Sequence, residues 1–200
     1  MLNAIAQFRE NVKRIRELGA LAGAVETLTT AAIDVSDILR SQLVLVVSAL
    51  DHVIHEIVRV GMIEAAKGQR PKTDAYYRFH LPVTAIETAL SGADHETWIG
   101  ESVRKKLSWK SFQDADAIAE ACRLICGVNI WEAVGTELGA RPQDLKVQLR
   151  LIVERRNKIA HEADMDPTSP GFRWPISASL VDGAIEFVQK IVEAIFRVVK

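Results

Sequence analysis

An arginine and a histidine lie close together in the segment Glu154 to Asp164, which ends a long stretch of helical hydrophobic spacing. Arg156 is followed by Asn157, and His161 stands five residues after the arginine. An arginine holds phosphate through paired hydrogen bonds, and a histidine carries a proton near neutral pH. Cleavage of an RNA phosphodiester needs both functions, so this pair is the first candidate for chemistry in the chain.

The hydrophobic spacing of this segment places Arg156 among apolar side chains. Leu149, Ile152 and Ile159 fall on one helical stripe, and Arg156 stands between the last two. A charged guanidinium on an apolar stripe is costly unless it is paired or lines a site. Two interpretations therefore stay open. Either Arg156 belongs to a site, or it extends to solvent or pairs with a buried carboxylate such as Asp51.

Helical geometry separates the two candidate catalytic residues. Five residues along an ideal helix rotate the side-chain direction by about 140°, so Arg156 and His161 do not point the same way. Either the helix tightens or ends near Ala160, or a second copy of the chain completes the site. Because a two-fold interface repeats each contact, two paired helices would gather both copies of each residue. We therefore expect a homodimer with a composite site.

Contacts with RNA must be local, because the formal net charge of the chain is −1. Arg155 is a second candidate for the catalytic arginine by spacing, but it lies off the apolar stripe. The cations of this helix that we predict to bind RNA are Arg155, Lys158, Arg150 and Lys146. A second cationic group, for which a solvated helix end is the plainer interpretation, is Arg104, Lys105, Lys106 and Lys110.

The rest of the chain predicts an all-α protein. Hydrophobic residues make up 48% and charged residues 26% of the 200 residues, which is ordinary for a soluble globular protein. No repeat or Pro/Ser-rich linker is present, so we expect one domain spanning residues 1–200. Hydrophobic spacing and end signals predict helices over about 2–18 (ending near Gly19), 20–33, 36–67, 83–89, 94–107, 112–125, 130–138, from Pro142 through the motif, and 179–199, with a loop over 69–80.

Cysteine usage and hydropathy indicate whether to expect a metal site, an oxidising compartment or a membrane. Cys122 and Cys126 have no nearby His or Cys pair to complete a zinc site, so we expect reduced, half-buried thiols and neither metal nor cofactor. Reduced thiols suit a cytoplasmic protein. The most apolar stretch, residues 43–50, is far shorter than the ~20 residues that cross a bilayer. The charged N-terminal stretch is unlike a signal peptide, so we expect no association with a membrane.

Several segments together resemble a known family. Residues 156–161 (RNKIAH) resemble the signature of HEPN domains, an arginine and a histidine four to six residues apart with a polar residue after the arginine. Residues 49–56 (ALDHVIHE) resemble the early helix of the RiboL-PSP type, with Asp51 and His55 four apart. Residues 110–113 (KSFQ) resemble its mid-chain element, and residues 129–131 (NIW) precede the motif helix. The ordered set extends over about residues 40–165.

The resemblance implies an all-α, HEPN-like helical bundle that dimerises, here with additional N- and C-terminal helices. It also implies a metal-independent endoribonuclease in which the RNA 2′-hydroxyl attacks the adjacent phosphorus. Such enzymes act in toxin–antitoxin, CRISPR-associated or phage-defence systems, so an antitoxin or regulatory protein is an expected partner. Arg156 and His161 would be catalytic, and Asn157, Asp51 and His55 would support them.

Two other interpretations compete with the enzyme. A non-catalytic HEPN module would use the same groove to bind nucleotide or RNA, or would bind a regulatory protein. A purely structural helical scaffold would leave Arg156 and His161 exposed, separated and unconnected.

Overall fold

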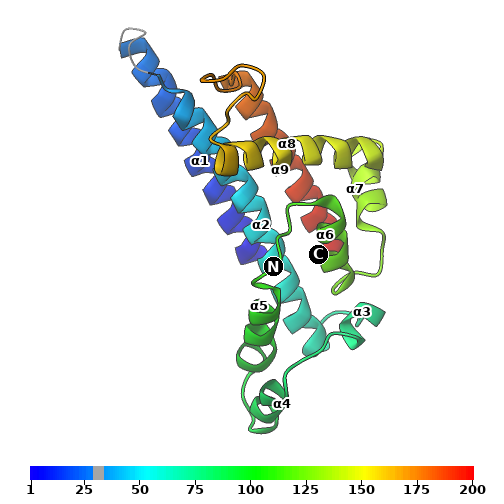
Figure 1. Cartoon of the computed structure of the whole chain (residues 1–200). Helices are drawn as coiled ribbons and strands as arrows, with labels where there is room; N and C mark the ends of the chain where they lie inside the picture. The colour runs from blue at the N-terminus through cyan, green and yellow to red at the C-terminus, as the bar shows by residue number, and fades with distance from the viewer. Residues whose placement is uncertain (29–33) are drawn as a thin grey trace.

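The computed structural model describes residues 1–28 and 34–200, which form helices joined by loops (Figure 1). The predicted all-α class is confirmed, since the described residues contain no strand beyond one isolated bridge between Met165 and Arg173. The elements run in the order α1 (Leu2–Leu28), α2 (Ser36–Ala66), α3 (Asp74–Tyr77), α4 (Val83–Leu90), the π-helical turn η1 (Glu96–Gly100), α5 (Glu101–Leu107), α6 (Ala115–Arg123), α7 (Ile130–Leu138), α8 (Pro142–Glu162) and α9 (Ala178–Val199).

Helix α2 forms the centre of the core. It lies antiparallel to α1 as a long hairpin, and α8 and α9 also pack against it (Figure 1). The apolar residues that recur at helical spacing are buried, as the sequence predicts: Leu39, Leu43, Val46, Val47, Leu50, Val53, Ile54, Ile57 and Val58. The predicted end is also confirmed, because the helix stops at Ala66 and Gly68 takes a left-handed φ of 72°.

The predicted helix end near Gly19 is wrong, because α1 continues through this glycine to Leu28. A Cβ atom at Gly19 would lie 2.6 Å from the side-chain nitrogen of Gln42. That amide is buried and donates to the carbonyl of Ile15 at 2.7 Å. Gly19 therefore serves the close approach of α1 and α2. The predicted helix over 20–33 is the continuation of α1, and residues 29–33 lie outside the described residues.

The other helix boundaries agree with the sequence to different degrees. The predictions over 83–89, 130–138 and 179–199 match α4, α7 and α9 closely. The stretch predicted as one helix over 94–107 opens with the turn η1 before α5. The helix predicted from residue 112 begins only at Ala115, because the Asp114 carboxylate caps the N–H groups of Asp116 and Ala117. The predicted loop contains the short helix α3.

Helix α8, which carries the Arg/His motif, crosses the long hairpin and contacts α2, α6 and α7 (Figure 1). Pro142 occupies its first turn, as the sequence predicts. Only Leu145 and Leu149 are fully buried in this helix, so one long face of α8 remains exposed. Residues 163–177 then return from the end of α8 to α9. No helix within the described ranges is both long and apolar enough to cross a membrane.

Candidate active site

The crossing of α8 over α2 places the Arg156 guanidinium near the Asp51 carboxylate. Burial lowers the pKa of Arg156, and the charge of Asp51 opposes this shift. The Arg156 Nε–H is buried and has no hydrogen-bond partner in the described structure. Arg156 as a residue is only half-buried, so the accessible part of its charged guanidinium can bind an anion. This electrostatic interaction joins two of the segments on which the sequence resemblance rests.

Asp51 ties helix α2 to the loop between α5 and α6. Its Oδ1 accepts a hydrogen bond from the backbone N–H of Phe112, and it lies 3.4 Å from the hydroxyl of Ser111. Its Oδ2 lies 3.8 Å from Nε2 of His55, one helical turn along α2. The carboxylate therefore holds the loop in place, and its charge acts on Arg156.

His55 is oriented by the same loop. Its Nε2 lies 3.2 Å from the carbonyl oxygen of Lys110, and its ring packs on Phe112 with 4.4 Å between centroids. A carbonyl only accepts, so the hydrogen of a neutral ring is assigned to Nε2, which leaves Nδ1 as an acceptor. The imidazole is thus fixed beside Asp51.

His161 lies apart from this group. It is exposed in the last turn of α8 and has no side-chain partner among the described residues. The helix continues past Ala160 to Glu162, so His161 is still part of it. Arg156 and His161 therefore point in directions about 140° apart on one regular helix. A single chain brings Asp51 near both Arg156 and His55, whereas His161 and Asn157 are exposed.

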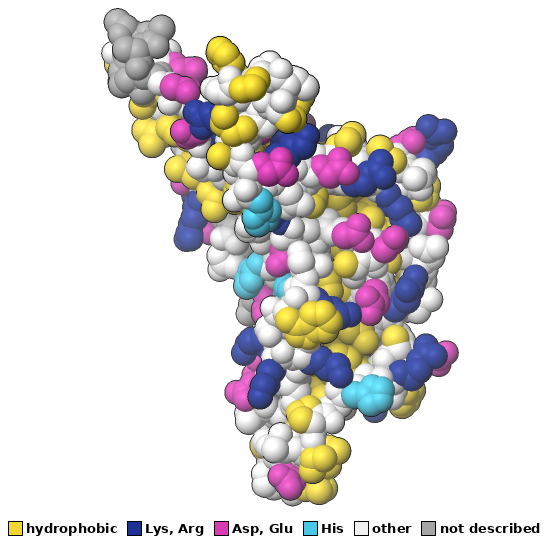
Figure 2. Space-filling model, viewed as in Figure 1, with side chains coloured by type: hydrophobic (Ala, Val, Ile, Leu, Met, Phe, Trp, Pro, Cys, Tyr) yellow, Lys and Arg dark blue, Asp and Glu magenta, His cyan; other side chains and the backbone are white. Residues whose placement is uncertain are grey.

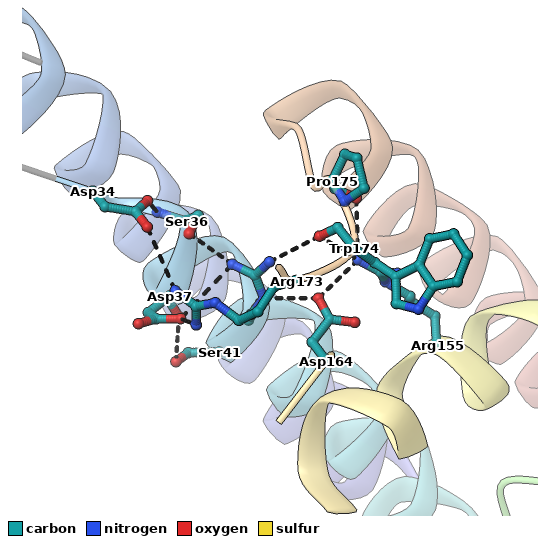
Figure 3. A network of polar contacts seen from close by, with 10 residues as sticks. Asp34, Ser36, Asp37, Ser41, Arg155, Asp164, Arg173, Trp174 and Pro175 are labelled. Carbon is teal, nitrogen blue, oxygen red and sulfur yellow. Dashed lines mark hydrogen bonds and ion pairs between the residues drawn. The ribbon is translucent and has the colours of Figure 1, made fainter. Parts of the chain in front are cut away.

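A buried ionic cluster directly behind the motif was not foreseen from the sequence (Figure 3). Asp164 is completely buried, and its Oδ2 accepts from Nε of Arg40 and from Nη2 of Arg155, each at 2.8 Å. Both arginines also donate to the carbonyl of Trp174, at 2.9 and 3.1 Å. Burial lowers the pKa of Arg155, while Asp164 raises it and Arg40 lowers it further. This cluster joins the start of α2, the end of α8 and the segment before α9.

The backbone turns sharply to bury Asp164. Ala163 and Asp164 take left-handed φ values of 51° and 60°, and the Asp164 N–H donates to the carbonyl of Lys158. This turn directs the carboxylate inward only three residues after His161, so the cluster also fixes the end of the helix that carries the histidine. A sequence signal existed, because Arg40 interrupts the apolar pattern of the helix predicted over 36–67.

The cations of α8 predicted to bind RNA lie in different surroundings. Arg155 is held in the buried cluster. Lys158 places its Nζ 5.2 Å from the centroid of the Trp174 ring. Arg150 is largely exposed and lies 3.7 Å from a carboxylate of the same helix, and Lys146 lies 3.6 Å from a carboxylate of α6. Lys158 and Arg150 are therefore the more accessible cations of this helix.

The second cationic group is divided by the structure. Its first three members lie exposed at the end of α5, and we call them the α5 cationic cluster: Arg104, Lys105 and Lys106. Lys110 lies beyond α5 in the loop that contacts His55.

Cys122 is buried and Cys126 half-buried, and both are free thiols. Burial raises the pKa of Cys122 to about 12. In residues 1–28 and 34–200, no three His, Cys, Asp or Glu side chains are grouped so that they could hold a metal ion.

A family model described as RiboL-PSP-HEPN matches residues 9–200. The chain belongs to the RiboL-PSP-HEPN family. The match includes most of α1 and all of α9, and so extends beyond the range 40–165 in which the sequence resemblance is strongest. No curated protein and no solved structure matches the chain. Membership of this family indicates a function connected with RNA.

Proposed function

We propose that this RiboL-PSP-HEPN protein is a metal-independent endoribonuclease. The observation that carries the proposal is the half-buried Arg156 guanidinium, which lies near Asp51 of the Asp51–His55 pair where α8 crosses α2. Anion binding and proton transfer are thereby available on neighbouring helices.

The proposed reaction uses a nucleophile that the substrate itself contains. The RNA 2′-hydroxyl loses its proton and attacks the adjacent phosphorus, and the bond to the 5′-oxygen breaks as that oxygen gains a proton. The products carry a 2′,3′-cyclic phosphate and a 5′-hydroxyl. Arg156 stabilises the charge that accumulates on the phosphoryl oxygens, and His161 transfers a proton. Asp51 and His55 hold the loop between α5 and α6 in place, and the charge of Asp51 acts on Arg156.

We further propose that a homodimer completes the site. One helix separates Arg156 and His161 by about 140°, yet the reaction needs both around one phosphate. Helix α8 has the exposed face that such pairing requires, and Leu151 on this helix is 56% exposed. Two-fold pairing of α8 would set His161 of one copy beside Arg156 of the other.

Cleavage of single-stranded RNA in the presence of EDTA tests the enzyme. We expect His161→Ala to lower the rate about 10²–10⁴-fold, as for loss of a general acid or base. We expect Arg156→Ala to lower it about 10²–10³-fold, as for loss of one donor to a developing charge. The matched controls, His95→Ala and Arg141→Ala, should cleave as the wild type does. Strict dependence on an added divalent metal, or full activity of His161→Ala, would contradict this mechanism.

The composite site is tested by mass in solution and by mixing variants. Equal amounts of Arg156→Ala and His161→Ala chains, allowed to exchange, form heterodimers in half of the cases, and each has one intact site. We therefore expect recovery of about a quarter of the wild-type rate. A strictly monomeric protein with full ribonuclease activity would contradict the shared site.

A non-catalytic RNA-binding or nucleotide-binding module is the second candidate. The observation that favours it is the separation of Arg156 from the exposed His161 within one chain. This candidate predicts RNA binding that depends on Arg156 and no cleavage product at all.

As an enzyme, the protein would act in the cytoplasm as a toxin or phage-defence effector under an antitoxin or regulatory protein. Its expression should then slow growth, and His161→Ala should relieve the effect.

A further inference from the structure

We propose that a pocket between α3, α5 and α6 binds one nucleotide of single-stranded RNA, with its base stacked on Trp109. The pocket has a volume of about 350 Å³. This volume lies at the lower end of the roughly 300–1,000 Å³ of small-molecule sites, and suits a nucleotide better than a protein segment. The inference rests on the proposed function, because it supplies a binding subsite for the same RNA.

Trp109 provides the stacking surface. It follows α5 and is 78% exposed, so its large apolar ring does not contribute to the core. Phe79 and Phe112 also line the pocket. Figure 2 shows exposed hydrophobic side chains in the middle of this face, with Lys and Arg side chains around them. Bases of single-stranded RNA bind proteins by stacking on aromatic rings of this kind.

The charges around the pocket suit a phosphate. Arg78 and Arg123 line it, both are exposed, and neither guanidinium has a side-chain partner within the described part of the chain. Lys106 and Lys110 add two further cations. Glu120 is the one carboxylate among the described residues of the lining, and it is already paired with Lys110 at 2.9 Å. The pocket therefore has an excess of positive charge.

The pocket and the candidate active site share one loop. Lys110 lines the pocket, and its backbone carbonyl contacts His55. Phe112 lines the pocket, and its backbone N–H donates to Asp51. One short loop thus forms a wall of the pocket and also orients the two α2 residues beside Arg156. A strand with one base on Trp109 would have its neighbouring phosphates near this loop.

Binding to an oligonucleotide that cannot be cleaved tests the pocket. The probe is a fluorescein-labelled oligouridine of about ten nucleotides, within the length that single-strand sites cover, with 2′-O-methyl groups in place of the nucleophile. Anisotropy gives the affinity of the full-length protein. We expect Trp109→Ala to weaken binding about 5-fold to 100-fold, as for loss of one stacked base, and Trp109→Phe to retain most of the affinity. Leu90→Ala, which removes another exposed apolar side chain, should bind as the wild type does.

The phosphate contacts have their own test. Arg78→Ala/Arg123→Ala should reduce the salt dependence of binding by about 1.4 in log–log slope, because two cations are lost. The control Arg14→Ala/Arg141→Ala removes the same charge outside the pocket and should change the slope less.

Unchanged affinity of Trp109→Ala would overturn the inference, even if the wild type cleaves RNA as proposed. Equal competition by polyglutamate and polyuridine would also overturn it, since the site would then bind acidic protein. Trp109-dependent binding by a protein that never cleaves RNA would support the pocket and refute the enzyme.

Discussion

Removal of the buried Asp164 carboxylate should destabilise the protein strongly. In Asp164→Ala, the guanidinium groups of Arg40 and Arg155 lose the one carboxylate that both contact at 2.8 Å. Arg40 is the more affected, because only 6% of the residue is exposed and water does not replace the lost partner. The same substitution places alanine at a φ of 60°, a left-handed conformation that aspartate tolerates better than alanine does.

The magnitude follows from these two effects. Removal of one partner from a buried ion pair costs about 3–5 kcal/mol. Arg40 keeps hydrogen bonds to Ser36 and to the Trp174 carbonyl, so the lower end, about 3 kcal/mol, applies. The left-handed backbone adds about 1 kcal/mol for alanine. The sum of about 4 kcal/mol corresponds to a fall in Tm of roughly 8–16 °C for a chain of this size.

Urea unfolding and thermal unfolding, both followed by circular dichroism, measure the effect. Asp164→Asn should cost about half as much, because asparagine accepts one hydrogen bond and tolerates the left-handed backbone. The matched control is Glu137→Ala, which removes an ion pair to Arg197 of 2.6 Å at the surface, where the two side chains are 40% and 49% exposed. Its cost should stay below about 1 kcal/mol.

The result that refutes this reasoning is a free energy of unfolding for Asp164→Ala within about 1 kcal/mol of that for Glu137→Ala. The cluster would then contribute no more than an exposed ion pair, and it would not fix the end of α8.

Three further predictions follow from particular contacts. Because burial raises the pKa of Cys122 to about 12, Ellman's reagent at pH 8–9 should modify Cys126 in the folded protein and Cys122 only after unfolding. The same shift contributes stability below the ordinary thiol pKa of 9.0, and this contribution is lost as the pH rises toward about 12. Gly61→Ala should destabilise the protein by about 1–3 kcal/mol in urea unfolding, because the new Cβ would lie 2.6 Å from Ile125. The control Gly183→Ala, with open space at that position, should not destabilise the protein. Neutralisation of the α5 cationic cluster should weaken RNA binding and its salt dependence, and unchanged salt-dependent affinity would exclude the cluster from the RNA path.

The sequence alone determined the helical class and the central helix, and it determined that the Arg/His motif lies on a helix. These properties depend on residues within a few turns of one another, because hydrophobic period and end signals act locally. The apolar stripe of α2 between Leu39 and Val58 is buried as its spacing predicts. Local signals also identified Arg156 as a charge that needed a partner, with Asp51 as a candidate.

Other features depended on how distant segments pack. Glycine is a residue type that often ends a helix, but Gly19 lies within α1. Its lack of a Cβ leaves room for the side chain of Gln42, which is remote in sequence. Asp164 and Arg40 are 124 residues apart, and only the crossing of α8 over α2 joins them. The separation of His161 from Arg156 likewise required knowing that α8 continues to Glu162. Local periodicity specifies which face of a helix is apolar, whereas tertiary packing specifies which charges from different helices meet on it.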